Sequence, residues 1–161
     1  MGMTRAICLL FGVGLLRPGP GTWGSAVALA AGIAIDRWLG FPALVAATLA
    51  VTLIGWWALR AELGDTHDDP SEFVIDEVAG QWLALLFPAA AFWWRGMDMV
   101  WPGWVAAFVF FRLFDIWKPW LVGRADRRGD AWGVMADDLW AGVFAGVATI
   151  VAAGIAHGVL M

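Results

Sequence analysis

Five long apolar segments dominate this 161-residue sequence and restrict the folds open to it. They are residues 25–39, 41–59, 78–94, 102–117 and 139–160. A helix of about 20 apolar residues spans the hydrocarbon core of a bilayer. Charged residues make up only 15% of the chain, against about 25% in a soluble domain. We therefore predict an all-α integral membrane bundle of about five transmembrane helices, in one membrane-embedded domain over residues 1–161.

A shorter apolar run at residues 7–16 is about half a crossing, so we expect a short helical segment there that is buried or re-entrant. Cys8 is the only cysteine and lies in this run. Neither a disulfide nor a thiolate metal site can be built from it. The net charge of −4 argues against nucleic acid as a partner, because nucleic-acid binding favours a basic surface.

Basic residues are divided unequally between the two ends of the predicted bundle. Arg37 and Arg95 fall in connections at one end, and Arg112 lies within an apolar segment. The basic residues predicted at the other end are Arg17, Arg60, Lys118, Arg124, Arg127 and Arg128. Cytoplasmic connections carry the excess of Lys and Arg in membrane proteins. We therefore expect this second end to face the cytoplasm.

Acidic residues gather at the same end as the basic ones. Of 14 acidic residues, only Asp36 and Asp98 fall at the opposite end. Two pairs, Asp76-Glu77 and Asp137-Asp138, lie where a connection enters an apolar segment. One interpretation is purely structural: acids at a helix N-terminus cap the helix or interact favourably with its dipole. The repeated pattern of two adjacent acids at the membrane edge favours a shared function instead.

The connection before the first pair contains His67 and three further acids, Asp68, Asp69 and Glu72. An ordinary solvated loop explains these acids as well as a functional site does.

Arg112 and Asp115 form a further polar cluster near the end of the fourth apolar segment. A spacing of three places both on one face of a helix, and Pro119 should end that helix so that Lys118 emerges from it. An Arg or Asp within a membrane helix costs about 2.5–3.5 kcal/mol on insertion scales, so such residues are usually functional. A purely structural Arg112–Asp115 pair is the alternative.

Five carboxylates at one depth would repel one another unless some are protonated or a cation lies among them. They are Asp76, Glu77, Asp115, Asp137 and Asp138. Ligands that offer only oxygen select a hard ion, and Mg²⁺ fits this set. A carboxylate-bound metal beside Arg112 and Lys118 suits phosphoryl transfer, because the cations stabilise charge on the phosphoryl oxygens.

The glycine- and proline-rich stretch at residues 17–25 lies at the same end of the predicted bundle. Glycines let backbone amides approach a ligand, and we expect Ser25 to open a helix whose N-terminus suits an anion. Thr22 and Ser25 are therefore candidates to hold a phosphate group. An ordinary turn is the alternative, because such stretches are common in turns.

Four motifs in order resemble the phosphatidylglycerophosphatase A family and cover most of the chain. They are residues 20–25 (PGTWGS), 76–80 (DEVAG), 111–119 (FRLFDIWKP) and 133–138 (GVMADD). The resemblance implies a Mg²⁺-dependent phosphatase of the bacterial inner membrane, with its site facing the cytoplasm. It implies hydrolysis of phosphatidylglycerophosphate to phosphatidylglycerol. The family's acids correspond to Asp76, Glu77, Asp115, Asp137 and Asp138, its lysine to Lys118 and its arginine to Arg112. Residues 127–132 depart from the family's His-Gly-Gly pattern.

These observations give the following assignment of roles. We expect catalysis by Asp76, Glu77, Asp115 and Asp138, metal binding by these four with Asp137, and phosphate binding by Thr22, Ser25, Arg112 and Lys118. Either water attacks phosphorus with one carboxylate as general base, or an aspartate attacks directly. A membrane ion or proton carrier that uses intramembrane Asp and Arg is the alternative from another class. A lipid-binding scaffold is a third interpretation.

Overall fold

The computed structural model describes residues 2–64 and 70–160, and it is helical without a strand in these ranges. The all-α prediction is confirmed. The elements are α1 (Met3–Cys8), the 3₁₀ helix η1 (Leu10–Leu15), α2 (Pro20–Leu39), α3 (Phe41–Leu63), α4 (Ile75–Trp93), α5 (Trp101–Trp117), α6 (Leu121–Asp126) and α7 (Ala131–Leu160). His67, Asp68 and Asp69, which the sequence placed in an acidic connection, lie outside the described residues.

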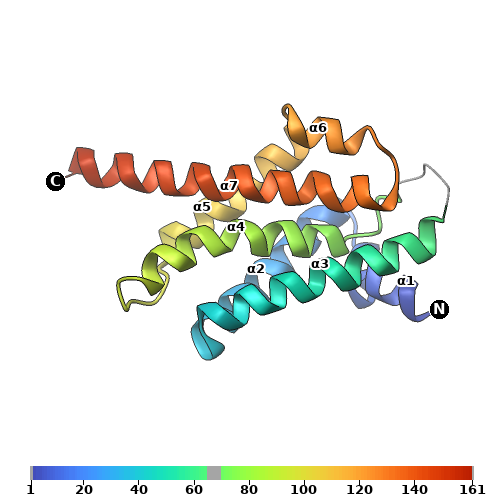
Figure 1. Cartoon of the computed structure of the whole chain (residues 1–161), viewed down its shortest axis with the longest axis horizontal. Helices are drawn as coiled ribbons and strands as arrows, with labels where there is room; N and C mark the ends of the chain where they lie inside the picture. The colour runs from blue at the N-terminus through green and yellow to red at the C-terminus, as the bar shows by residue number, and fades with distance from the viewer. Residues whose placement is uncertain (1, 65–69, 161) are drawn as a thin grey trace.

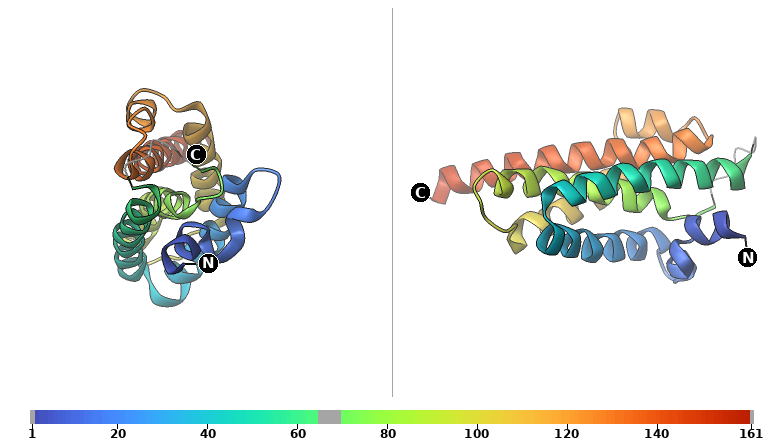
Figure 2. Two further views of the ribbon diagram at one scale, coloured as in Figure 1. Left: turned by 90° about the vertical axis from the view of Figure 1, so that its right-hand side faces the viewer. Right: turned by 60° about the horizontal axis from the view of Figure 1, so that its bottom comes forward.

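Five long helices run alternately up and down one axis, with α7 along most of the length of the molecule (Figure 1). Helix α4 packs against α2, α3, α5 and α7, and the end-on view shows it at the centre of the bundle (Figure 2). Among the described residues, α3 and residues 131–157 of α7 are long and apolar enough to cross a membrane by length and composition. The other three long helices do not reach that standard.

Two helices, α2 and α7, begin at least five residues before the apolar segments predicted for them. Helix α2 begins at Pro20 rather than Ser25, because Gly19 adopts a left-handed conformation (φ 70°) and Pro20 suits the first helical position. Helix α7 begins at Ala131 rather than residue 139, with the Gly133 amide donating to Asp130 Oδ1 at 2.8 Å. Asp130 therefore caps this helix. Asp137 and Asp138 lie about two turns inside it, so they are not its N-terminal cap.

The end of α5 agrees with the prediction from Pro119. The helix stops at Trp117, and Lys118 takes a left-handed conformation (φ 51°) as its C-terminal cap. The short helix α6 follows, which the sequence did not indicate. Its Val122 and Gly123 are buried, and α6 packs against α7. The reversal between α5 and α7 is therefore a packed element rather than an open loop.

Helices α4 and α7 approach each other closely through glycines. A Cβ on Gly142 of α7 would lie 2.4 Å from the Gly80 carbonyl oxygen of α4, and a Cβ on Gly80 would lie 2.6 Å from the Asp138 carbonyl oxygen. Small residues at helix crossings are typical of membrane bundles, where they let backbones come together. This contact brings Asp76 and Glu77, at the start of α4, close to Asp137 and Asp138 of α7.

The N-terminal segment forms α1 and η1, which confirms the short helical segment predicted there. The Val74 amide donates to the Cys8 carbonyl at 2.8 Å, which ties α1 to the entry of α4. Cys8 is fully buried, and burial raises the pKa of its thiol to about 12. The thiol is therefore protonated and enclosed at neutral pH.

Candidate active site

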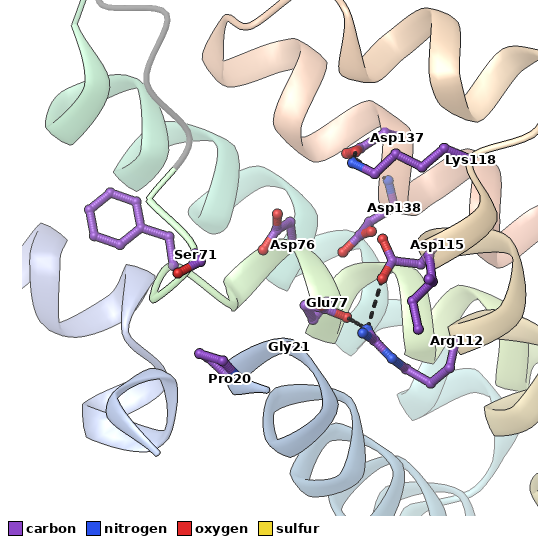
Figure 3. A pocket seen from close by; sticks show the side chains of 12 residues that line it. Pro20, Gly21, Ser71, Asp76, Glu77, Arg112, Asp115, Lys118, Asp137 and Asp138 are labelled. Atoms are coloured by element: carbon purple, nitrogen blue, oxygen red, sulfur yellow. Dashed lines mark hydrogen bonds and ion pairs between the residues drawn. The ribbon is translucent and has the colours of Figure 1, made fainter. Parts of the chain in front are cut away.

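A polar cavity of about 280 Å³ lies at the end of the bundle where α2, α4, α5 and α7 meet (Figure 3). Its lining residues are Pro20, Gly21, Ser71, Phe73, Asp76, Glu77, Arg112, Asp115, Ile116, Lys118, Asp137 and Asp138. The five carboxylates predicted from the sequence therefore meet in one cavity, together with both predicted cations. Ser71 and Phe73 were not predicted, because nothing in the connection before α4 distinguishes them from ordinary loop residues.

Three of the five carboxylates form a compact group. Glu77 from the first turn of α4, Asp115 from the last turn of α5 and Asp138 from α7 each offer an oxygen, and these oxygens lie within 4.8 Å of one another. Asp138 is 3% exposed, and its Oδ2 atom has no hydrogen-bond partner in the part of the chain that the structure describes. Three convergent carboxylates with a buried oxygen left open fit a hard cation such as Mg²⁺.

Arg112 neutralises two members of this group. Its Nη1 atom lies 2.5 Å from Glu77 Oε2 and 2.9 Å from Asp115 Oδ2, as the dashed lines in Figure 3 show. All three side chains are at most 15% exposed. The Arg112–Asp115 pair predicted from their spacing is present, but Arg112 also bridges α5 to α4. A buried ion pair needs such compensation, since an uncompensated buried charge is strongly destabilising.

Lys118 contacts α6 and α7 through two aspartates. Its Nζ atom donates to Asp137 Oδ2 at 2.9 Å and also to Asp126 of α6. Burial alone would lower the pKa of Lys118, but the hydrogen bonds to Asp126 and Asp137 raise it above its ordinary value. The other oxygen of Asp137 accepts the Asp138 amide at 3.0 Å. Asp137 is thus held by Lys118 at the cavity wall, beside the group of three rather than within it.

Thr22 and Ser25 do not line the cavity. Thr22 is exposed in the first turn of α2. Ser25 is fully buried, and its hydroxyl lies 2.7 Å from Glu77 Oε2 and 3.2 Å from Arg112 Nη1. The role of these two residues in phosphate binding stays a prediction.

Two other charged groups lie apart from the cavity residues. Glu72 pairs with Arg5 at 2.6 Å, which links the entry of α4 to α1. Arg128 donates two hydrogen bonds to Asp130. These two residues lie in the stretch that departs from the family's histidine pattern, and here Asp130 caps α7 while Arg128 pairs with its carboxylate.

The opposite end of the bundle holds a smaller cavity of about 150 Å³. Asp36 and Asp98 line it, with Arg37 and Trp93 among their neighbours. The described parts of α2, α3, α4, α5 and α7 carry no ionisable side chain between this end and the candidate active site. The charged groups thus form two separate sets.

Comparisons with known proteins agree on one family. The family model for phosphatidylglycerophosphatase A matches residues 6–153. A Bacteroides thetaiotaomicron protein, provisionally named a phosphatidylinositol-3-phosphatase, is 36% identical over 88% of this chain and 88% of its own length. The Haemophilus influenzae protein named phosphatidylglycerophosphatase A is 32% identical over 84% of this chain and 79% of its own. Its Escherichia coli namesake is 33% identical over 83% and 73%. No solved structure shows a significant match.

Proposed function

Because the chain belongs to the phosphatidylglycerophosphatase A family, we propose that it hydrolyses the terminal phosphomonoester of phosphatidylglycerophosphate to give phosphatidylglycerol and phosphate. Membership of this family makes it a phosphatase. The observation that carries the proposal is one cavity in which three convergent carboxylates lie beside Arg112 and Lys118. Such a site offers both a cation position and basic groups for a phosphate.

Glu77, Asp115 and Asp138 would hold Mg²⁺. A bound Mg²⁺ would supply positive charge that stabilises the phosphoryl oxygens during transfer. Asp137 would contribute mainly by holding Lys118. An ammonium group has three donors, and Asp126 and Asp137 use two of them. The third donor of Lys118 is left to bind a phosphate oxygen, and Arg112 reaches the same cavity from α5.

We assign the role of general base to Asp76. Its side chain lines the cavity, and it is not one of the three carboxylates that converge. Asp76 would take a proton from water as the water oxygen bonds to phosphorus. The bond from phosphorus to the glycerol oxygen breaks, and that oxygen leaves as an alcohol after taking a proton from solvent water, while the proton held by Asp76 returns to solvent. If Asp76 is the base, Asp76→Asn should lower kcat and keep the affinity for Mg²⁺.

We also propose that α2, α3, α4, α5 and α7 all cross the bacterial inner membrane, with the candidate active site at the cytoplasmic face. Exposed tryptophans, which favour membrane interfaces, occur at both ends of the bundle. They include Trp23, Trp117, Trp120 and Trp132 at the site end, and Trp38, Trp93, Trp94 and Trp101 at the other. Trp57 of α3 and Trp140 of α7 are exposed as well. The excess of basic residues at the site end supports a cytoplasmic orientation.

Single cysteines test the orientation, since Cys8 is buried and gives little background. Arg95→Cys and Arg127→Cys both replace exposed residues, at opposite ends of the bundle. A membrane-impermeant thiol reagent should label Arg95→Cys in spheroplasts, and Arg127→Cys only after lysis. The reverse pattern would place the candidate active site outside the cytoplasm.

Purified protein should be tested on phosphatidylglycerophosphate, phosphatidate and phosphatidylinositol 3-phosphate, with and without Mg²⁺. We expect release of phosphate from the first lipid to be fastest. Faster hydrolysis of phosphatidylinositol 3-phosphate would show instead that the substrate is the lipid in the name of the Bacteroides relative. An ion carrier would instead transport ions into vesicles and release no phosphate. The lack of ionisable groups along the middle of the described helices supports the phosphatase over this alternative.

A further inference from the structure

The glycine-rich start of α2 lies against a carboxylate at the edge of the cavity. Gly21 and Ser25 are one helical turn apart and lie on the same face. Both approach the Glu77 side chain from α4. We propose that Gly21 and Ser25 form a seat that fixes the Glu77 carboxylate within the acidic triad, the group of Glu77, Asp115 and Asp138. This inference rests on the metal site proposed at Glu77, Asp115 and Asp138, and it does not depend on which lipid is the substrate.

Gly21 provides the first wall of the seat. A Cβ added there would lie 2.0 Å from Glu77 Oε1 and 3.1 Å from Glu77 Cδ. Any side chain at this position would occupy the place where the carboxylate lies. The seat is also at the N-terminus of a 20-residue helix, where the helix dipole favours a negative charge. Glycine at position 21 is therefore explained by the Glu77 carboxylate above it.

Ser25 provides the second contact. Its side chain is fully buried, with 0% of its surface exposed to solvent. Its hydroxyl lies 2.7 Å from Glu77 Oε2 and 2.8 Å from the Gly21 carbonyl oxygen, and it can accept from Arg112 Nη1 at 3.2 Å. A hydrogen bond to an ionised carboxylate is about twice as strong as a neutral one. Ser25 and Arg112 together therefore hold one oxygen of Glu77 in place.

Gly24 explains how α2 comes close enough. A Cβ there would lie 2.8 Å from the Val74 Cβ atom, at the residue before α4. Thr22 lies between these contacts in sequence but is exposed. The pattern of Gly21, Gly24 and Ser25 is thus the set of positions that α2 turns toward the start of α4. These contacts with the side chain of Glu77 favour a role in positioning this carboxylate over a role in binding the substrate phosphate.

The two interpretations of this motif differ in what a substitution changes. If Ser25 bound the substrate phosphate, its loss would raise KM and leave metal affinity unchanged. If Ser25 positions Glu77, its loss should weaken metal binding and lower kcat, with little change in KM. Metal binding can be measured without substrate, for example by the electron paramagnetic resonance of Mn²⁺ titrated into the full-length protein in detergent.

Ser25→Ala is the main variant, and Thr149→Ala is its matched control. Thr149 is also a buried hydroxyl that contacts a carbonyl four residues earlier, at 2.8 Å, but it lies on α7 away from the cavity. We expect Ser25→Ala to weaken Mn²⁺ binding about 10- to 100-fold, the range typical of groups that orient metal ligands. Thr149→Ala should leave Mn²⁺ binding, kcat and KM within about twofold of wild type.

Wild-type Mn²⁺ affinity in Ser25→Ala would overturn the proposal, whether or not KM rises. Gly21→Ala is a second test, expected to weaken Mn²⁺ binding at least as much because its Cβ would displace the carboxylate. If Gly21→Ala does not fold, Ser25→Ala decides alone. A wild-type protein that binds Mn²⁺ but hydrolyses no lipid phosphate would refute the proposed function and leave the seat to be judged by these affinities.

Discussion

Replacing Gly142 by alanine tests whether the close approach of α4 and α7 sets the geometry of the acidic triad. The new Cβ would lie 2.4 Å from the Gly80 carbonyl oxygen, whereas ordinary contact begins at 3.4 Å. Both groups belong to backbone or are fixed to it, so no change of rotamer relieves the overlap. The two helices would have to separate locally by about 1 Å, the difference between these two distances.

This separation would act directly on the triad. Asp138 lies one turn before Gly142 on α7, and Glu77 lies one turn before Gly80 on α4. Mg²⁺ requires near-octahedral ligands at about 2.0–2.1 Å, and a misplacement of about 1 Å can lower activity about 100-fold. We therefore expect kcat/KM to fall about 100-fold in Gly142→Ala, together with the affinity for Mg²⁺.

The stability of the variant should change much less than its activity. Overpacking costs about 1–3 kcal/mol, and alanine is about 1 kcal/mol better than glycine within a helix. Phosphate release, Mn²⁺ binding and thermal unfolding followed by circular dichroism would separate the two effects. Gly154→Ala is the matched control on the same helix, because its Cβ would meet nothing within 4 Å.

We expect Gly154→Ala to keep full activity. Wild-type activity and metal affinity in Gly142→Ala would show that the spacing of α4 and α7 does not set the site. Equal losses in both variants would point to a general effect of alanine in α7 and would refute the argument as well.

Three further predictions concern the metal and its neighbours. Chelation should abolish phosphate release, Mg²⁺ should restore it, and Ca²⁺ should restore it poorly because it favours larger and looser coordination; full turnover in excess chelator contradicts the metal site. Asp138→Asn should lower activity more than about 100-fold, because groups that only orient metal ligands cost about 10- to 100-fold. Asp98→Asn at the far end should leave activity nearly unchanged, and similar losses in both variants would show that the active site is not at Asp138. Arg112→Lys keeps the charge but loses the planar fork, so the variant should fold and bind Mn²⁺ yet hydrolyse slowly. Near wild-type rates would mean that Arg112 serves only as the partner of Glu77 and Asp115.

The positions of the long helices and the end at which the charges gather could be predicted from the sequence. The length of an apolar segment is a local property that can be read directly from the sequence. Because successive helices alternate in direction, every second connection lies at the same end of the bundle. The stop after Trp117 followed from Pro119, because a residue before proline disfavours the helical conformation. These inferences needed no knowledge of how the helices contact one another.

Helix boundaries were less predictable. Helix α7 begins eight residues before the predicted segment, at Ala131 rather than residue 139. The cap at Asp130 and the contact with α6 stabilise these additional turns. Helix α6 has only six residues, two of them charged. It shows no clear apolar period of its own, and its contact with α7 stabilises it.

The partners of each acidic side chain were decided only by the tertiary structure. The sequence grouped five carboxylates, but the rotation and spacing of α4, α5 and α7 bring Glu77, Asp115 and Asp138 together and leave Asp137 with Lys118. The same spacing turns Ser25 toward Glu77 rather than toward the cavity. The neighbours of a carboxylate depend on ångström-scale distances between helices. Close backbone contacts, such as that of Gly80 with Gly142, determine these distances. The local order of residue types along the chain does not encode them.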